Sequence, residues 1–210
     1  MEEEIDSIKV VLVGETGVGK TSIITQFVDE NFQKDQQSTT GGTFSIKTGL
    51  CDNGKKLKFE IWDTAGQEKY RALTKLFYKD VNAAVMVYDI TRKQTFEELK
   101  NYWTEQIKDN SLSNTFIAIA ANKSDLVDKE EVNEEEARDY AKSIDAIFLS
   151  TSAKNAQTVQ DLFTALGKKF MNCGNITYNN EPENDNLPSK KRRDTQQLSK
   201  KTEQKRKGCC

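Results

Sequence analysis

The 210-residue chain contains no histidine, two prolines and four cysteines. The lack of histidine excludes Ser-His-Asp and Cys-His catalysis, His-ligated zinc and histidine pH switches. The cysteines are Cys51, Cys173, Cys209 and Cys210, so there is neither a CxxC motif nor a disulfide framework, and we expect a reducing, cytosolic compartment. No apolar run approaches the roughly 20 residues that span a bilayer, and the acidic start MEEEIDS is unlike a signal peptide.

Charge is unevenly distributed along the chain, although the net charge is only −2. Residues 189–210 carry nine basic and two acidic side chains, whereas the other 188 residues carry 22 basic and 31 acidic ones. An acidic body argues against nucleic acid as its partner. A basic tail is attracted to an anionic surface.

Apolar patterns predict the strands and helices. Nearly continuous apolar runs indicate buried parallel strands at 8–14, 83–90, 116–121 and 146–150. Residues 57–62 alternate instead and follow Asn53-Gly54, which predicts a hairpin with 43–51. Helical spacing predicts two faces that pack on the sheet: Phe96, Leu99, Trp103 and Ile107 in one helix, and Val159, Leu162, Phe163, Leu166 and Phe170 in the last.

Strands that alternate with helices predict an α/β fold with right-handed crossovers, an open and mostly parallel sheet, and helices on both faces. We assign the folded domain to residues 8–171, preceded by an N-terminal extension at 1–7. Residues 172–210 are polar and contain both prolines, so we expect a disordered basic tail. Ligands of such sheets bind where the parallel strands end, which makes the loops at these ends the candidate sites.

The first predicted strand runs into a GxxxxGK[ST] pattern that opens a helix, as in phosphate-binding loops. Its glycines let backbone N–H groups converge on a phosphate, and the helix N-terminus adds a positive dipole. Lys20 supplies a positive charge for the β- and γ-phosphates, and the Thr21 hydroxyl is placed to ligate Mg²⁺. The candidate nucleotide-binding residues here are Gly14, Glu15, Thr16, Gly17, Val18, Gly19, Lys20, Thr21 and Ser22. The alternative is an ordinary glycine-rich turn, and the loop alone leaves ATP and GTP open.

Two further loops at predicted strand ends favour guanine. In NKSD at 122–125, the Asp125 carboxylate can accept hydrogen bonds from guanine N1–H and the exocyclic amine, whereas adenine presents a lone pair there. The Lys123 stem can cover the base, and we expect its amine to tie this loop to the phosphate loop. In TSAK at 151–154, backbone N–H groups can reach guanine O6. The candidate residues are Asn122, Lys123, Asp125, Ser152, Ala153 and Lys154. Each motif alone is common in surface loops, but their shared sheet edge favours base recognition.

The segment WDTAGQE at 62–68 supplies the elements for hydrolysis. Asp63 ends the alternating strand and can hold Mg²⁺ through water. Gly66 lets a backbone N–H reach a γ-phosphate, and Gln67 can orient the attacking water. A lone loop glutamine is more often simply solvated, but its position within DTAGQ favours the catalytic role.

Taken together, these motifs make the chain resemble the Ras superfamily of small GTPases, specifically its Rab branch, over roughly residues 7–171. GETGVGKTS, WDTAGQEKY, NKSD and STSAK occur in the family's order and approximate spacing. The resemblance implies a six-stranded sheet flanked by helices, a GTP/GDP cycle with two mobile switch segments, and a role in vesicle traffic. It also implies that Phe32 packs edge-on against guanine. Thr39 would bring its hydroxyl and carbonyl to Mg²⁺ and the γ-phosphate, with the neighbouring Thr40 as an alternative.

Phe44, Trp62 and Phe77 resemble the aromatic triad through which Rab proteins present their nucleotide state to effectors. The alternative is plain core or sheet-surface packing. The chain departs from the Rab pattern in TGG at 40–42, which lacks an apolar residue after the switch threonine, and at Asp80, where Rab proteins usually have glycine. Both departures fall in the effector-reading surface and leave the subfamily and its partners open.

The resemblance implies that Lys20 and Mg²⁺ neutralise the phosphates while Gln67 positions water. Arg71 fits a helix surface better than a catalytic role, so we expect slow intrinsic hydrolysis that an arginine finger from an activating protein accelerates. Further implied partners of this monomer are an exchange factor, effectors and a prenyl-binding chaperone or dissociation inhibitor. The rival interpretations are a nucleotide-locked binding module and a P-loop ATPase or kinase. Intact Thr21, Asp63 and Gln67 argue against the first, and the guanine motifs argue against the second.

The chain ends in KRKGCC, which is not a C-a-a-X sequence. The Rab resemblance implies geranylgeranyl groups on Cys209 and Cys210. Two lipid chains anchor a protein stably, and the basic runs of the tail add attraction to anionic lipid. We therefore expect the protein on the cytoplasmic face of an internal membrane, with a soluble cytosolic pool. Metal scavenging or adventitious oxidation of the two thiols is the alternative.

Overall fold

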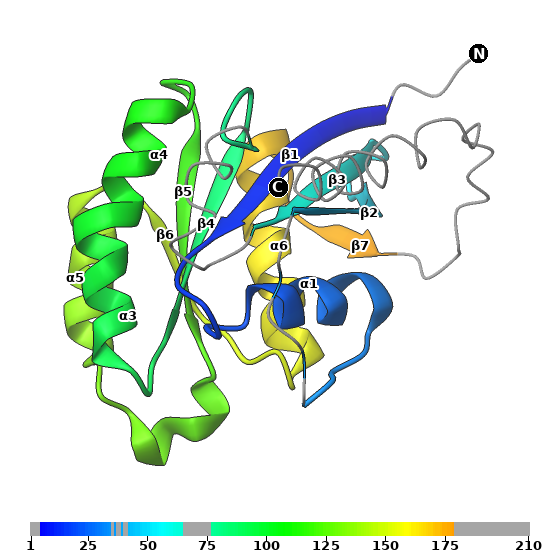
Figure 1. The fold of residues 1–210 in the computed structure, drawn as a ribbon. Helices are drawn as coiled ribbons and strands as arrows, with labels where there is room; N and C mark the ends of the chain where they lie inside the picture. The colour runs from blue at the N-terminus through cyan, green and yellow to red at the C-terminus, as the bar shows by residue number, and fades with distance from the viewer. Residues whose placement is uncertain (1–4, 35, 37–38, 40–41, 65–76, 179–210) are drawn as a thin grey trace, which may run out of the picture. The chain divides into compact units, whose positions relative to one another are not determined.

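The computed structural model describes residues 5–34, 36, 39, 42–64 and 77–178. Within these ranges the chain forms one sheet with helices on both of its faces (Figure 1). The strands are β1 (Ile5–Val13), β2 (Thr43–Cys51), β3 (Lys56–Asp63), β4 (Ala83–Asp89), β5 (Phe116–Asn122), β6 (Ile147–Ser150) and β7 (Ile176–Tyr178). The helices are α1 (Lys20–Asp29), α3 (Lys93–Glu98), the π-helical turn η3 (Leu99–Trp103), α4 (Thr104–Asn110), the 3₁₀ helix η4 (Ser124–Lys129), α5 (Glu134–Ser143) and α6 (Ala156–Met171).

The sheet order is β6-β5-β4-β1-β3-β2-β7. Five strands run parallel: β1 pairs with both β3 and β4, and β5 pairs with β4 and β6. The predicted hairpin is confirmed, because β2 pairs with β3 in antiparallel register from Thr43 opposite Asp63 to Leu50 opposite Lys56. Its turn contains Gly54 at a φ of 81°, the left-handed conformation that glycine adopts without a steric penalty.

The two faces of the sheet carry separate hydrophobic clusters. Alternate residues of β1 point to opposite faces, as in any strand. Ile8, Val10 and Leu12 join the cluster beneath α1 and α6. Val11 and Val13 join the cluster beneath α3, α4 and α5. Figure 1 shows these two helical layers on either side of the strands. Burial on both faces explains why the parallel strands are almost continuously apolar.

Both predicted helix faces are confirmed. Phe96, Leu99, Trp103 and Ile107 are buried against the sheet. The π-helical turn η3 lies between α3 and α4, where the Thr104 amide donates to the Leu99 carbonyl five residues earlier. In α6, the buried side chains are Val159, Leu162, Phe163 and Leu166, with Phe170 partly buried beside them.

The fold class is confirmed, but the six-stranded sheet and the boundary at residue 171 need correction. The sheet has a seventh strand, β7, which pairs with β2 in antiparallel register. Ile176 is buried, and the Tyr178 ring meets the Phe27 ring edge-on at 5.0 Å between centroids. The folded domain therefore extends through Tyr178, into residues that were predicted to belong to a disordered tail. A strand of three residues within polar sequence is fixed by this packing rather than by composition.

The beginning of the domain also differs from the prediction. β1 starts at Ile5 rather than Ile8, because its backbone pairing with β3 continues to Ile5 opposite Lys56, beyond the apolar run. Residues 1–4 and 179–210 lie outside the described residues, so the tail prediction is retained only for 179–210. Among the described helices, none has both the length and the apolar character that crossing a membrane requires.

Candidate nucleotide-binding site

The phosphate loop joins β1 to α1 at the carboxyl end of the parallel strands, as predicted. Gly14 and Gly19 have φ angles of 140° and 99°, which side chains rarely tolerate. A Cβ atom at Gly14 would collide with the Val87 carbonyl oxygen, and one at Gly19 with the Asn122 amide nitrogen. These two glycines therefore allow the loop to lie directly against β4 and β5.

The side chain of Lys20, the first residue of α1, reaches back into this loop. Only 5% of the residue is exposed, and its ammonium group donates to the carbonyls of Gly14 at 2.8 Å and Glu15 at 2.9 Å. Burial lowers the pKa of Lys20 to about 8. No side chain caps α1, and its first turn contains no acidic residue. The helix N-terminus and the lysine thus offer a positive environment to an anion.

Next to Lys20, three oxygen-bearing side chains from different elements converge. The Thr21 hydroxyl donates to Asp63 at 2.6 Å and lies 2.8 Å from the Thr39 hydroxyl, which is 3.4 Å from the same carboxylate oxygen. Burial raises the pKa of Asp63, although the Thr21 hydrogen bond and the Lys20 charge oppose this. The other carboxylate oxygen, Oδ1, is buried and has no hydrogen-bond partner within the described part of the chain.

This cluster fits a magnesium ion. Mg²⁺ prefers hard oxygen ligands and is commonly held by one or two carboxylates together with substrate phosphates. Thr21, Thr39 and Asp63 supply two hydroxyls and a carboxylate, and Asp63 Oδ1, unpaired within the described ranges, is a buried acceptor that a cation would satisfy. In the ranges that the structure describes, no group of three or more His, Cys, Asp or Glu residues forms an all-protein cation site. Any Mg²⁺ here would therefore also need ligands from water or a bound phosphate.

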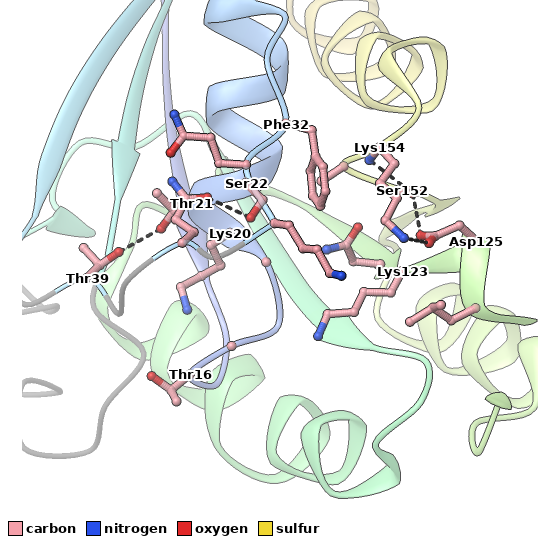
Figure 2. A pocket seen from close by; sticks show the side chains of 18 of the residues that line it. Thr16, Lys20, Thr21, Ser22, Phe32, Thr39, Lys123, Asp125, Ser152 and Lys154 are labelled. Atoms are coloured by element: carbon pink, nitrogen blue, oxygen red, sulfur yellow. Dashed lines mark hydrogen bonds and ion pairs between the residues drawn. The ribbon is translucent and has the colours of Figure 1, made fainter.

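The other end of the pocket is built around Asp125 (Figure 2). Ser152 Oγ donates to one of its oxygens and Lys154 Nζ to the other, both at 2.6 Å. Burial would raise the pKa of Asp125, but these two partners outweigh it and hold the pKa below its usual value. The Lys154 ammonium also lies 5.9 Å from the centre of the Phe32 ring. An ionised carboxylate, a lysine and an aromatic ring therefore line this end of the pocket.

Asn122 connects the two ends. Its side-chain amide donates to the Val18 carbonyl at 2.7 Å, so β5 holds the phosphate loop directly. The prediction that the Lys123 amine makes this tie is wrong. The amine instead donates to Asp89 at 2.6 Å, because this buried carboxylate at the end of β4 is a charged acceptor that attracts the ammonium group.

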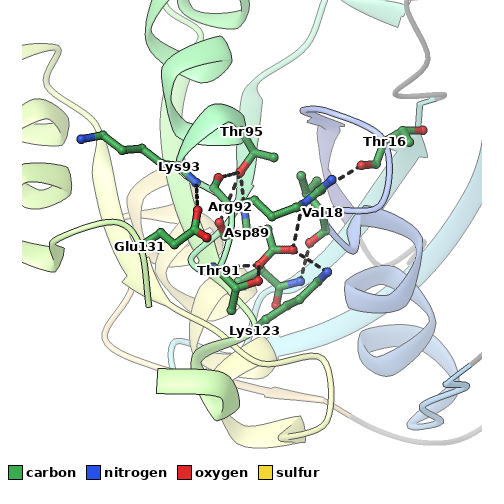
Figure 3. Close-up of polar contacts among 10 residues, drawn as sticks. Thr16, Val18, Asp89, Thr91, Arg92, Lys93, Thr95, Lys123 and Glu131 are labelled. Atoms are coloured by element: carbon green, nitrogen blue, oxygen red, sulfur yellow. Dashed lines mark hydrogen bonds and ion pairs between the residues drawn. The ribbon is translucent and has the colours of Figure 1, made fainter. Parts of the chain in front are cut away.

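Asp89 gathers a network that sequence reasoning missed (Figure 3). Besides Lys123, the carboxylate accepts from Arg92 Nε at 3.2 Å and from the hydroxyl of Thr91 at 2.7 Å. Arg92 Nη2 then donates to the Thr16 carbonyl of the phosphate loop at 2.9 Å. Lys123 thus reaches the phosphate loop through Asp89 and Arg92 rather than directly. The available signal was the position of Asp89 at the end of a buried parallel strand.

Most of the predicted nucleotide-binding residues line one pocket of about 230 Å³. They are Thr16, Gly17, Gly19, Lys20, Thr21, Ser22, Phe32, Thr39, Asn122, Lys123, Asp125, Ser152, Ala153 and Lys154. Gly14, Glu15 and Val18 are not in the lining. The lining also contains Gln33, Lys34, Gln36, Thr64 and Leu126, which sequence reasoning missed. Of these, Gln36 has a visible role, since it accepts a hydrogen bond from Ser22 at 2.9 Å.

The aromatic triad lies apart from the pocket lining, on β2, β3 and the segment before β4. Trp62 stands between Phe44 and Phe77, with ring centroids 4.9 and 5.2 Å away. Phe44 is 46% exposed, so core packing does not account for it. Gly66, Gln67, Thr40, Arg71 and the terminal cysteines Cys209 and Cys210 lie outside the described residues.

The chain is similar in sequence to known proteins over most of its length. A family model described as Ras family matches residues 9–172. The chain is 47% identical over 163 residues to the Ras-related protein Rab-22A of Homo sapiens, which covers 78% of this chain and 83% of that protein. It is 44% identical over 170 residues to the Ras-related protein Rab-31 of Mus musculus, and this alignment covers 81% of the present chain and 86% of Rab-31. The matched segment contains every residue that lines the pocket.

Proposed function

The chain belongs to the Ras family, as a Rab-type small GTPase that binds GTP and GDP, hydrolyses GTP to GDP and regulates membrane traffic, and we propose that the pocket between the phosphate loop and Asp125 is where the nucleotide binds. One observation carries this proposal. Groups suited to a guanine base, to phosphates and to a hard cation line a single pocket at the carboxyl ends of the parallel strands.

Base recognition rests on Asp125. Its carboxylate is ionised at neutral pH, because Lys154 and Ser152 hold its pKa low, and these partners also fix its two oxygens in space. Guanine offers two coplanar donors to such a group, N1–H and the exocyclic amine. Adenine has neither donor and presents its N1 lone pair to the carboxylate, which corresponds to a discrimination of about a thousandfold or more. Phe32 and the stems of Lys123 and Lys154 are the proposed apolar contacts of the base.

Phosphate binding rests on α1 and Lys20, and we propose that Thr21, Thr39 and Asp63 hold Mg²⁺ beside them. The buried Oδ1 of Asp63, which has no hydrogen-bond partner among the described residues, supports this assignment. When bound, Mg²⁺ would neutralise charge on the β- and γ-phosphates. The chain's own contribution is to hold the Lys20 ammonium at the loop centre and to keep both threonine hydroxyls turned toward Asp63.

Hydrolysis is assigned to Gln67, which would orient a water molecule for in-line attack, and Gly66 is the proposed backbone donor to the γ-phosphate. Both assignments rest on the DTAGQ motif. Loss of the γ-phosphate would remove the contacts that order Thr39 and Gly66, so the two switch segments would loosen together. This is how the nucleotide state would become visible to partners, with Phe44, Trp62 and Phe77 as the proposed effector surface.

Exchange factors, GTPase-activating proteins and effectors are the partners that membership of the Rab group implies. We propose in addition that Cys209 and Cys210 carry geranylgeranyl groups and that a prenyl-binding dissociation inhibitor keeps a soluble pool of the monomer. The basic composition of residues 189–210 supports attachment to an anionic membrane surface, on the cytoplasmic face of an internal compartment.

The base-reading role is tested with Asp125→Asn. An amide can accept from N1–H of xanthine and donate to its C2 oxygen, whereas its NH₂ group opposes the amine of guanine. We expect GDP affinity to fall by about a thousandfold and xanthosine diphosphate affinity to rise above it. Equilibrium titration with fluorescent analogues of both nucleotides measures this.

The matched control is Asp128→Asn in the same 3₁₀ helix, because Asp128 is exposed and is not part of the pocket lining. It should leave both affinities unchanged. Binding of xanthosine diphosphate also proves that the Asp125→Asn variant is folded. A variant that is folded and still prefers GDP would show that Asp125 does not read the base.

A further inference from the structure

Two cysteines that are 122 residues apart in the sequence touch in the structure. Cys51 ends β2, and Cys173 lies in the short segment between α6 and β7. Their sulfur atoms are 3.3 Å apart, with the Cys173 thiol donating to the sulfur of Cys51. This contact lies at the edge of the sheet where β7 is added, away from the nucleotide pocket. It is independent of how the chain uses GTP.

The backbone on both sides of this contact is fixed by hydrogen bonds. The Asp52 amide donates to the Asn175 carbonyl at 2.9 Å, and the Gly174 amide donates to the Asp52 carboxylate at 3.2 Å. In the β2–β7 ladder, Cys51 is opposite Ile176. The two sulfurs therefore meet because the neighbouring residues of each cysteine are bonded to those of the other.

Two glycines make room for this arrangement. A Cβ atom at Gly167 in α6 would collide with Ile176 Cδ1 and lie 3.0 Å from the Phe59 ring. A Cβ atom at Gly49 in β2 would lie 2.6 Å from Ile176 Cγ2 and 3.1 Å from the Tyr178 ring. Glycine at these positions lets Ile176 enter the core, and this places Cys173 against Cys51.

The two thiols differ in accessibility. Cys51 is 2% exposed, and burial raises its pKa to about 12, with a further contribution from the neighbouring Cys173 thiol. Cys173 is partly exposed. Since the thiolate is the nucleophile and must meet the reagent, a dissolved oxidant can reach Cys173 but not Cys51.

We propose that Cys51 and Cys173 are a thiol modification site, which forms a reversible intramolecular disulfide with a low-molecular-weight disulfide such as oxidised glutathione. The Cys173 thiolate attacks one sulfur of the reagent, whose S–S bond breaks and releases the first glutathione thiolate. The Cys51 sulfur then attacks the Cys173 sulfur as its proton passes to the leaving glutathione, and the mixed disulfide bond breaks to release the second glutathione. The two protein thiols lose two protons and two electrons, and the reagent becomes two molecules of glutathione.

The product fastens residues 172–178 to the body of the domain. In the reduced protein, β7 is held by a ladder of three residue pairs, from Cys51 opposite Ile176 to Gly49 opposite Tyr178, and by side-chain packing. Such a short edge strand opens locally at small free-energy cost. A covalent bond beside its first residue restricts that opening, because the strand can no longer separate from β2 at this end.

The experiment uses the full chain, loaded with GDP, in a Cys209→Ser, Cys210→Ser background so that the terminal thiols do not react. The protein is incubated with buffers of oxidised and reduced glutathione. We expect loss of two hydrogen atoms in the intact mass and a single linked peptide that joins Cys51 to Cys173. Hydrogen exchange of the Ile176–Tyr178 amides should slow by about tenfold or more, and reductant should reverse all three changes.

Two variants separate the steps. In Cys51→Ala, the reaction should stop with one glutathione on Cys173. In Cys173→Ser, neither glutathione nor a disulfide should appear while the protein is folded, because Cys51 is buried. If the unsubstituted pair instead accumulates the mixed disulfide on Cys173 without ring closure, the proposal is wrong. It is also wrong if the link forms only in denaturant, or if it forms without slowing exchange in β7.

Discussion

Asp89 offers the sharpest test of how the nucleotide pocket is held together. The residue is only 1% exposed, yet its carboxylate has four donors: Lys123 and Arg92 at one oxygen, and the amide and hydroxyl of Thr91 at the other. Burial would raise the pKa of Asp89, but the hydrogen bonds from Lys123 and Thr91 outweigh it and keep the pKa below its usual value. The anion is therefore stabilised in the folded protein.

Replacing Asp89 with Asn keeps the shape and removes the charge. The new NH₂ group faces either the two cations or the two Thr91 donors, so two hydrogen bonds are lost and replaced by repulsion. Hydrogen bonds to charged groups contribute roughly 1.5–3 kcal/mol each. The side chains of Lys123 and Arg92 are 33% and 45% exposed, so water can partly replace the lost hydrogen bonds. We therefore reduce the summed contribution and expect a loss of about 2–4 kcal/mol in the free energy of unfolding.

The same substitution should weaken nucleotide binding, because Arg92 and Lys123 link the phosphate loop to the NKSD segment at 122–125 through Asp89. We expect GDP to dissociate about tenfold faster, which corresponds to about 1.4 kcal/mol. Stopped-flow release of a fluorescent GDP analogue measures the rate, and urea unfolding in excess GDP measures the stability. The matched control is Asp139→Asn, whose carboxylate is 68% exposed and pairs with an exposed lysine in α5, Lys142. It should cost at most about 0.5 kcal/mol.

The effect must also depend on pH in a defined direction. Since the pKa of Asp89 is lower in the folded than in the unfolded state, its stabilisation is fully present above the unfolded value of about 3.9. This stabilisation is lost as the pH falls from about 3.9 through the lower pKa that Asp89 has in the folded protein. The stability difference between the wild type and Asp89→Asn should thus be constant near neutrality and shrink in acid. If Asp89→Asn and Asp139→Asn have the same free energy of unfolding at pH 7, the Asp89 carboxylate does not hold the pocket together.

Two further changes have clear expected results. Gly167→Ala should destabilise the domain by about 1–3 kcal/mol in urea unfolding, despite alanine's better helix propensity, because its methyl group would collide with Ile176; a more stable variant would contradict the packing of β7. Gln67→Leu should bind GTP normally but fail to hydrolyse it when an activating protein is added, as measured by single-turnover phosphate release; normal stimulated turnover would remove Gln67 from the mechanism.

The spacing of apolar residues in the sequence was sufficient to predict the strands and helices that bury a whole face. The apolar runs located the parallel strands, and the spacing of Phe96, Leu99, Trp103 and Ile107 located a helix face that is indeed buried. It failed for β7, where only Ile176 and Tyr178 are apolar and where docking depends on space at distant glycines. Sequence spacing also could not pair Cys51 with Cys173, because that contact follows from β7. The match to the Ras family confirms the resemblance on which the expected function rested.

For the site, the rule that ligands bind at strand ends found Asp63, Asn122 and Asp125 but was not applied to Asp89, which ends β4 in the same way. No motif marks that aspartate, since its role is to bind two cations of the protein rather than the ligand. The same omission explains the wrong partner for Lys123. The NKSD motif predicts a contact of Lys123 with the phosphate loop, whereas in the structure its amine donates to the buried carboxylate of Asp89.

The direction of the strands explains why one edge carries the whole site. The five parallel strands all end there, which brings the loops after β1, β4, β5 and β6 together with Asp63 at the end of β3. The antiparallel strand β2 instead begins at this edge, with Thr43 opposite Asp63. Thr39, four residues earlier, therefore reaches the Thr21 hydroxyl at 2.8 Å. The hairpin turn at Asn53-Gly54 makes β2 antiparallel to β3, and this direction places the start of β2 at the same edge as the phosphate loop. Thr39 can therefore lie beside Thr21.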